Sequence, residues 1–153
     1  ILDRFLSDVS PEAGKDWVGI VTDAMNSRSG DANDTVAEAE SSRSPDSQPS
    51  LPLNAYVGTY RDPWYGEIFI TLTDDDRLWF KSGRSEPLSG PLEHFQFDTF
   101  IARWTERKYN NDAYVSCSLG AEGNIERIRM KAVSPATDFS FDFHDLDLVR
   151  VPE

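Results

Sequence analysis

Cysteine and histidine are scarce in this chain of 153 residues, and basic residues are outnumbered by acidic ones, 15 against 27. The single cysteine, Cys117, excludes an internal disulfide and leaves the redox compartment open. No apolar run approaches the roughly 20 residues that a membrane-spanning helix needs, so we expect no transmembrane helix. The net charge of −12 argues against nucleic acid and against an anionic membrane surface as partners.

The residues that are present divide the chain into three parts. Hydrophobic residues make up 39% and aromatic residues 12%, which is enough for a packed core. The first residue is Ile1 rather than Met, so we expect further sequence upstream. Residues 1–26 carry apolar side chains at helical spacing and predict a short helix that needs a partner surface. Residues 27–50 are rich in Ser, Asp and Glu and predict a linker, with at most a frayed helix around Thr35–Glu40.

Residues 51–153 predict a domain of short antiparallel strands. Ile68, Ile70 and Leu72 alternate with Glu67, Phe69 and Thr71, and Ile128, Met130 and Ala132 alternate with Arg127, Arg129 and Lys131, as in strands that bury one face. Turn residues at Asp74–Asp76 and Ala121–Asn124 separate such runs, and no crossover helix fits between them. A meander of this kind removes its sheet edges by closing into a barrel. The expected fold is therefore all-β, an antiparallel up-and-down barrel of about eight strands.

Three segments of this domain resemble a known family. They are Leu53–Gly66 (LNAYVGTYRDPWYG), Thr99–Trp104 (TFIARW) and Ser134–Phe143 (SPATDFSFDF). Together they resemble the lipocalin-like C-terminal domain, of unknown function, of penicillin-binding-protein/β-lactamase-related serine hydrolases, a superfamily of esterases and D-amino-acid peptidases. The resemblance covers most of residues 51–151. It implies that a catalytic domain precedes Ile1, that residues 1–26 are its helical tail, and that the barrel is its accessory partner.

The chemistry of that superfamily is not encoded within these residues. A Ser-x-x-Lys pair would place a lysine amine beside a serine hydroxyl on one helix turn, and no serine here has a lysine three residues on. Lys-Thr-Gly and Gly-x-Ser-x-Gly are also missing from the sequence. Tyr109-Asn110-Asn111 fits the family's Tyr-x-Asn pattern by letter only, in a predicted turn. We therefore expect no catalytic residue and no cofactor in this chain.

Metal binding is also not expected. His144 lies among acidic residues, but strand alternation places Asp145 and Asp147 on the opposite face, and His94 is distant in the sequence. Asp74–Asp76 lacks the spaced oxygen ligands and the glycine of a calcium loop. We predict a solvated or hydrogen-bonded histidine and a polar turn instead.

Cys117 and a row of basic residues have equally simple explanations. Cys117 lies on the inward side of its strand, where a thiol fills space rather than acting as a nucleophile. Arg127, Arg129 and Lys131 alternate with apolar residues and predict a solvated face. The alternative is that this row meets an acidic surface or a catalytic-domain partner.

Aromatic residues are more numerous than a small barrel core needs, and they are the candidate binding residues. One interpretation is that they fill the interior and seal its ends; the other is a lipocalin-like pocket for a small apolar ligand. We expect the phenylalanines to be mainly core, and Trp64 or Tyr65 to make any outward contact. The candidates for ligand or interface binding are Trp64, Tyr65, Trp79, Trp104, Phe139, Phe141 and Phe143.

The sequence thus predicts a non-catalytic accessory domain that shapes or gates the active site of its own upstream catalytic domain, or mediates homo-oligomerisation. A small apolar-ligand-binding module is the alternative. The apolar parity changes between Phe143 and Leu146, which predicts a bulge or turn. We expect Asp138 or Asp142 to hold this bend by accepting backbone N–H bonds.

Overall fold

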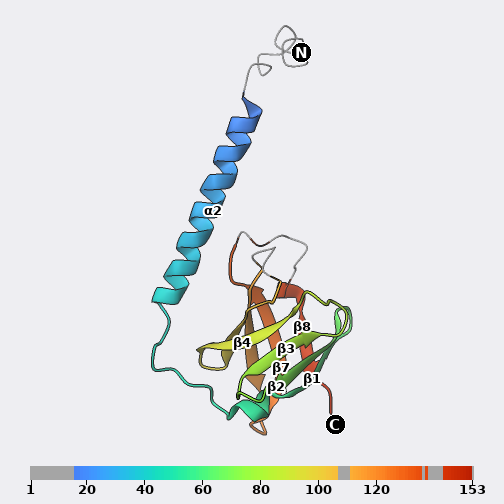
Figure 1. The fold of residues 1–153 in the computed structure, drawn as a ribbon. Helices are drawn as coiled ribbons and strands as arrows, with labels where there is room; N and C mark the ends of the chain where they lie inside the picture. Colours follow the sequence, from blue (N-terminus) through green and yellow to red (C-terminus); the bar gives the residue numbers. More distant parts are fainter. Residues whose placement is uncertain (1–15, 107–110, 136, 138–142, 153) are drawn as a thin grey trace.

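Eight antiparallel strands form a closed barrel in a computed structural model of the chain (Figure 1). The structure describes residues 16–106, 111–135, 137 and 143–152, without the side chains of residues 25 and 28–33. β1 and β8 close the barrel by pairing Tyr60 with Arg150 and Arg61 with Val149. The predicted fold class is therefore confirmed. The strands are β1 (Gly58–Asp62), β2 (Gly66–Leu72), β3 (Leu78–Ser82), β4 (Ser89–Gln96), β5 (Thr99–Ala102), β6 (Ala113–Leu119), β7 (Ile125–Ala132) and β8 (Asp147–Arg150).

Apolar and aromatic side chains from all eight strands fill the inside of the barrel. Strand alternation directs them inward, as predicted for Ile68 and Ile70. The Trp104 ring meets Phe80 edge-on at 5.2 Å between centroids and stacks on Phe143 at 6.2 Å. Gly90 lets the strands approach closely, since a Cβ there would lie 2.0 Å from the Arg103 carbonyl oxygen. The aromatic core is thus fixed by ring contacts and by a close backbone approach.

The helix α2 (Trp17–Ser41) precedes the barrel. Asp16 caps it, because its Oδ1 accepts a hydrogen bond from the Gly19 N–H at 2.9 Å. The helix extends beyond the short one expected within residues 1–26 and takes in much of the predicted linker. Its second half contains Ala and Glu, which favour helix even where few apolar contacts form. Within the described residues, no helix is long and apolar enough to cross a membrane.

The segment that follows α2 is attached to the barrel along the β4–β5 hairpin. The Arg43 guanidinium donates to the carbonyl oxygens of Phe95 at 2.6 Å and His94 at 3.0 Å. Further along, the Ser50 amide and hydroxyl both donate to the Asp98 carboxylate, at 2.9 and 2.7 Å. Residues 43–50 therefore run beside the hairpin as a docked strap. The division of the chain into a catalytic-domain tail, a linker and a barrel stays a prediction.

The sequence pattern predicts a strand from Tyr56 to Arg61 and places Phe139, Phe141 and Phe143 on one strand face. Tyr56 and Phe143 lie in short helices instead. Tyr56 ends the 3-10 helix η1 (Leu53–Tyr56), where it is fully buried and packs edge-on against Phe100 at 5.1 Å. Phe143 begins the 3-10 helix η3 (Phe143–Asp145), which provides the turn expected before Leu146. The strand prediction is wrong at these positions because each residue buries its ring at a place where the chain bends into a strand.

Candidate interaction site

The β1–β2 turn presents Trp64 to solvent on a fixed backbone. The Trp64 side chain is 81% exposed, far more than an indole ring in a core. Asp62 opens the turn, and its Oδ1 accepts hydrogen bonds from the Trp64 N–H at 2.7 Å and the Tyr65 N–H at 2.9 Å. Its Oδ2 accepts from the Asp147 N–H at 3.0 Å, which ties the turn to the start of β8. The Asp62 carboxylate therefore holds together two segments that are far apart in the sequence.

Charge on Asp62 is stabilised despite its burial. Its side chain is 6% exposed, and burial by itself would raise its pKa. The three backbone N–H bonds outweigh that effect and bring the pKa of Asp62 below its ordinary value. The carboxylate is thus ionised at neutral pH and keeps the turn in one conformation.

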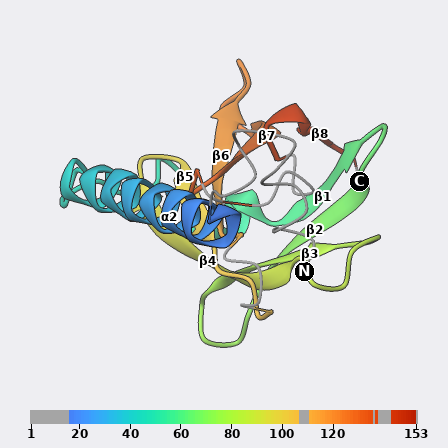
Figure 2. The same ribbon diagram turned by 90° about the horizontal axis from the view of Figure 1, so that it is seen from above.

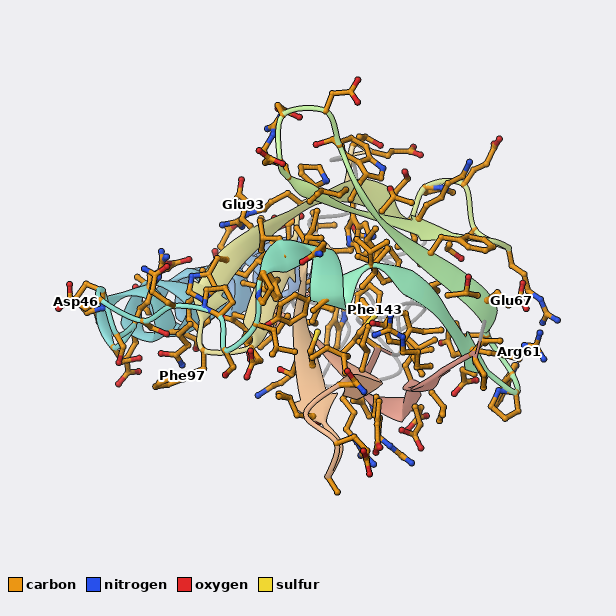
Figure 3. All side chains as sticks on the ribbon, turned by 90° about the horizontal axis from the view of Figure 1, so that it is seen from below. Asp46, Arg61, Glu67, Glu93, Phe97 and Phe143 are labelled. Atoms are coloured by element: carbon orange, nitrogen blue, oxygen red, sulfur yellow. The ribbon has the colours of Figure 1, made fainter. Side chains whose placement is uncertain are left out.

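The second support of the turn is Arg84, in the β3–β4 loop. Its guanidinium donates to the Trp64 carbonyl oxygen at 2.8 Å. Gly66 follows with a φ of +83°, a conformation that a side chain would strain, and a Cβ there would lie 2.7 Å from the Arg84 Nε. The glycine therefore allows both the bend and the close approach of Arg84. Arg61 and Glu67 form an ion pair beside the turn and lie together at the outer edge of the barrel (Figure 3).

A shallow surface hollow of about 460 Å³ adjoins the turn. It opens between β2 and the β3–β4 loop, with guanidinium groups on its border and the Phe69 ring in its wall. The arrangement combines an exposed indole with cationic and apolar surface, and it contains no nucleophile–base pair. It is suited to contact with another surface rather than to a reaction. The lining residues are Arg61, Asp62, Pro63, Gly66, Glu67, Phe69, Gly83 and Arg84.

The other candidate residues occupy different places. Tyr65 is half-buried and packs against the core. Trp79 is half-buried on β3 and donates its indole N–H to the Ser89 hydroxyl at 2.9 Å. Trp104 and Phe143 are in the core at 1% and 2% exposure, and Phe143 lies within the ring of strands (Figure 3). Trp64 is thus the described candidate that points outward. Phe139 and Phe141, like Asp138 and Asp142, lie outside the described residues.

The barrel interior leaves little room for the lipocalin-like alternative. The buried cluster fills most of the described interior, and a hollow of about 380 Å³ at one barrel end reaches the core residues Leu78, Leu92 and Phe100. Trp104 satisfies its indole N–H internally by donating to the Asn111 carbonyl oxygen at 2.7 Å. Cys117 is buried, as predicted, and burial raises the pKa of its thiol to about 12. A ligand inside the barrel would have to displace these side chains.

Arg127, Arg129 and Lys131 face outward on β7, as the alternation predicts. Arg127 pairs with Asp147, and Arg129 lies 3.9 Å from the same carboxylate. The row is therefore partly neutralised within the protein. His144 is exposed and lies 3.9 Å from Asp145, so these two are neighbours rather than on opposite faces of a strand. No group of three potential metal ligands occurs within the described parts of the chain.

Sequence reasoning missed the residues that build the site around Trp64. Asp62 precedes a proline at the start of a turn, a pattern typical of a side chain that accepts turn N–H bonds, and this signal could have been used. Arg84 had no such signal. Arg150 was missed as well: it donates to the carbonyl oxygens of Ala55 at 3.0 Å and Val57 at 2.8 Å and so fixes η1 to the barrel end.

The structure thus shows a closed β-barrel whose β1–β2 turn presents an exposed aromatic side chain. Residues 42–150 match the family described as a domain of unknown function, DUF3471, and the chain belongs to that family. A solved structure titled as the C-terminal domain of penicillin binding protein Rv0907 is similar, at 21% identity and a TM-score of 0.49, over 72% of this chain and 95% of that one. A comparison with curated proteins found no match. The family match confirms the recognised family as a domain of unknown function.

Proposed function

We propose that this chain is a non-catalytic accessory domain of a penicillin-binding-protein/β-lactamase-related serine hydrolase. The observation that carries the proposal is the fixed, 81% exposed Trp64 on a barrel whose interior is packed. The lack of Ser-x-x-Lys and Lys-Thr-Gly in the sequence supports a non-catalytic role. The family match and the three sequence segments described above support the class of parent protein.

The role we assign to the Trp64 turn is contact with the catalytic domain at the rim of its active site. Exposed tryptophans on fixed backbone are the residues that contribute most to protein interfaces, because they bury a large area and lose little entropy. Asp62 and Arg84 fix the backbone before any partner arrives. Contact at the rim would shape the entrance and restrict the size of substrate; homo-oligomerisation through the same turn is the other outcome of the test below.

Two measurements test the proposal. The isolated chain, assayed against esters, β-lactams and D-amino-acid peptides, should show no turnover, and turnover that persists through purification would contradict it. In the parent protein, Trp64→Ala should change activity or substrate preference and leave the folding of the isolated chain nearly intact. Tyr65→Phe is a matched control, because it keeps the half-buried ring that packs on the core.

Binding of a small apolar ligand is the second function that the sequence suggested, and the hollow at Leu78 and Phe100 is the place where it would occur. A fluorescent apolar probe titrated into the isolated chain would detect it. Saturable binding of the probe by the folded chain would restore this function.

A further inference from the structure

One side of α2 is covered by the barrel at the C-terminal end of the helix. Val36 and Ala39 are half-buried there, and Glu40 lies 4.0 Å from Arg103. On the barrel side, the outward-facing Ile101 is only 2% exposed although it lies outside the core. The last turn of α2 therefore lies beside the end of β5, and the strap that follows it lies along β4.

The same side of the helix continues past the barrel into solvent. Val18 and Val36 are about five turns apart at 3.6 residues per turn, as are Val21 and Ala39, so each pair faces one direction. Val18 is 78% and Val21 51% exposed, whereas Val36 is half-buried. The difference arises because α2 rises beyond the end of the barrel (Figure 1). The apolar side that packs on the barrel is thus extended by an uncovered apolar segment, and Trp17 beside it is 53% exposed.

The uncovered segment lies above the end of the barrel at which the Trp64 turn is located. The β1–β2 turn and the β3–β4 loop meet there through the bond from Arg84 to the Trp64 carbonyl oxygen. Seen from above, α2 passes over β4 and its N-terminal half leans across the barrel (Figure 2). A body placed against this end of the barrel would contact the underside of the helix as well.

Several bonds attach the strap to the barrel directly after the end of α2. The Arg43 guanidinium holds two carbonyl oxygens of β4 and lies 5.8 Å from the centre of the Phe95 ring. The Ser44 N–H donates to the Gln96 side chain at 3.3 Å, and Ser50 is bonded to Asp98 at the far end. Residues 43–50 are therefore held against the β4–β5 hairpin by several bonds and are not a flexible linker.

We propose that the N-terminal half of α2 and the Trp64 turn form one docking surface for a single folded protein domain with an apolar centre and a basic rim. The proposal rests on the proposed function, in that it takes this domain to be the catalytic domain of the parent protein. Continuity with the α2–barrel interface supports the apolar centre. Charge complementarity supports a basic rim on the part of the partner that faces α2, because residues 16–41 contain six acidic residues and one basic residue in a chain of net charge −12.

The test uses the full 153-residue chain and the catalytic segment of the parent protein, expressed separately, as the binding probe. Three variants are compared with the unchanged chain by calorimetric titration at low and high salt. Val18→Gln with Val21→Gln makes the uncovered segment polar and keeps a good helix former. Trp64→Ala removes the indole. Ser27→Gln is the matched control, because Ser27 lies about two and a half turns from Val18 and faces the other way.

We expect the double valine variant and Trp64→Ala each to weaken binding by about tenfold or more, while the Ser27 control binds normally. High salt should weaken binding of the unchanged chain, and circular dichroism should show unchanged helix content in all variants.

Loss of binding with Trp64→Ala alone would contradict the proposal that α2 and the Trp64 turn form one docking surface, and it would leave the proposed function standing. Binding that neither substitution weakens would overturn the docking role of both elements. If the unchanged chain does not bind the catalytic segment at all, both the proposed function and the docking surface are contradicted. If the unchanged chain self-associates and the same variants abolish this, the surface binds a second copy of the chain, and the proposal is contradicted.

Discussion

Replacing Asp62 with Asn isolates the contribution of one carboxylate to the Trp64 turn. The two oxygens of Asp62 accept three backbone N–H bonds, from Trp64, Tyr65 and Asp147. Asn keeps one accepting oxygen but places an NH2 group where the other oxygen was. If the oxygen stays with the two turn amides, the NH2 group faces the Asp147 N–H, and two donors meet without an acceptor.

The expected cost follows from these bonds. A hydrogen bond to a charged group contributes about 1.5–3 kcal/mol, and a neutral one about 0.5–1.5 kcal/mol. Losing one charged bond and weakening two should lower the free energy of unfolding by about 3.5–6 kcal/mol. With a urea dependence of roughly 1.5–2 kcal/mol per molar, the unfolding midpoint should fall by about 2–4 M. Asp75→Asn, in an exposed turn, is the control and should leave the midpoint nearly unchanged.

The pH dependence provides a second test of the same bonds. Because the pKa of Asp62 is lower in the folded protein, its stabilisation is complete above the ordinary Asp value of about 3.9. It is lost as the pH falls through the lower folded value. The difference between the unchanged chain and Asp62→Asn should thus be constant from neutral pH down to about 4 and shrink below it. Equal urea midpoints at neutral pH, or a difference that persists unchanged in acid, would refute the reasoning.

Four further predictions concern single residues. Phe143→Ala should lower the free energy of unfolding by about 3–5 kcal/mol in urea titrations, because the ring is 2% exposed and stacks on Trp104. Cys117 should resist a thiol reagent at mildly alkaline pH and react fully once urea unfolds the chain, since burial raises its pKa to about 12. Trp64→Ala should shift the urea midpoint of the isolated chain by less than about 0.5 M, as expected for an exposed side chain. Arg150→Met should lower the thermal midpoint, because the carbonyl oxygens of η1 lose their donor.

The barrel could be predicted because each strand carries its own signal. Alternation in β2 and β7 shows which side chains are buried, and Ile68, Ile70, Ile128 and Met130 are buried as that pattern requires. Leu72 is 38% exposed because it lies at the end of its strand, where the alternation no longer implies a covering layer. Local periodicity therefore predicts which side chains of a strand are buried. At the end of a strand, where no other layer covers it, the same pattern no longer predicts burial.

The length of α2 could not be predicted because its second half has few apolar residues. Apolar periodicity ends near Ala24, so the sequence suggests a linker from residue 27. The helix nevertheless continues to Ser41, and tertiary contacts at its end, such as Glu40 with Arg103, involve residues about 60 positions apart. Such contacts leave no trace in the local pattern.

The Trp64 site shows the same division between local and distant information. The turn itself is local, and Asp62 before Pro63 is a recognisable turn signal. The supports that make it a fixed surface are not local: Arg84 comes from the β3–β4 loop and the Asp147 amide from the start of β8. An exposed indole on a mobile loop would lose much of its binding energy to ordering, whereas one fixed by these distant bonds keeps it. The binding capacity we assign to Trp64 therefore depends on closure of the barrel, which brings β1, β3 and β8 to the same end.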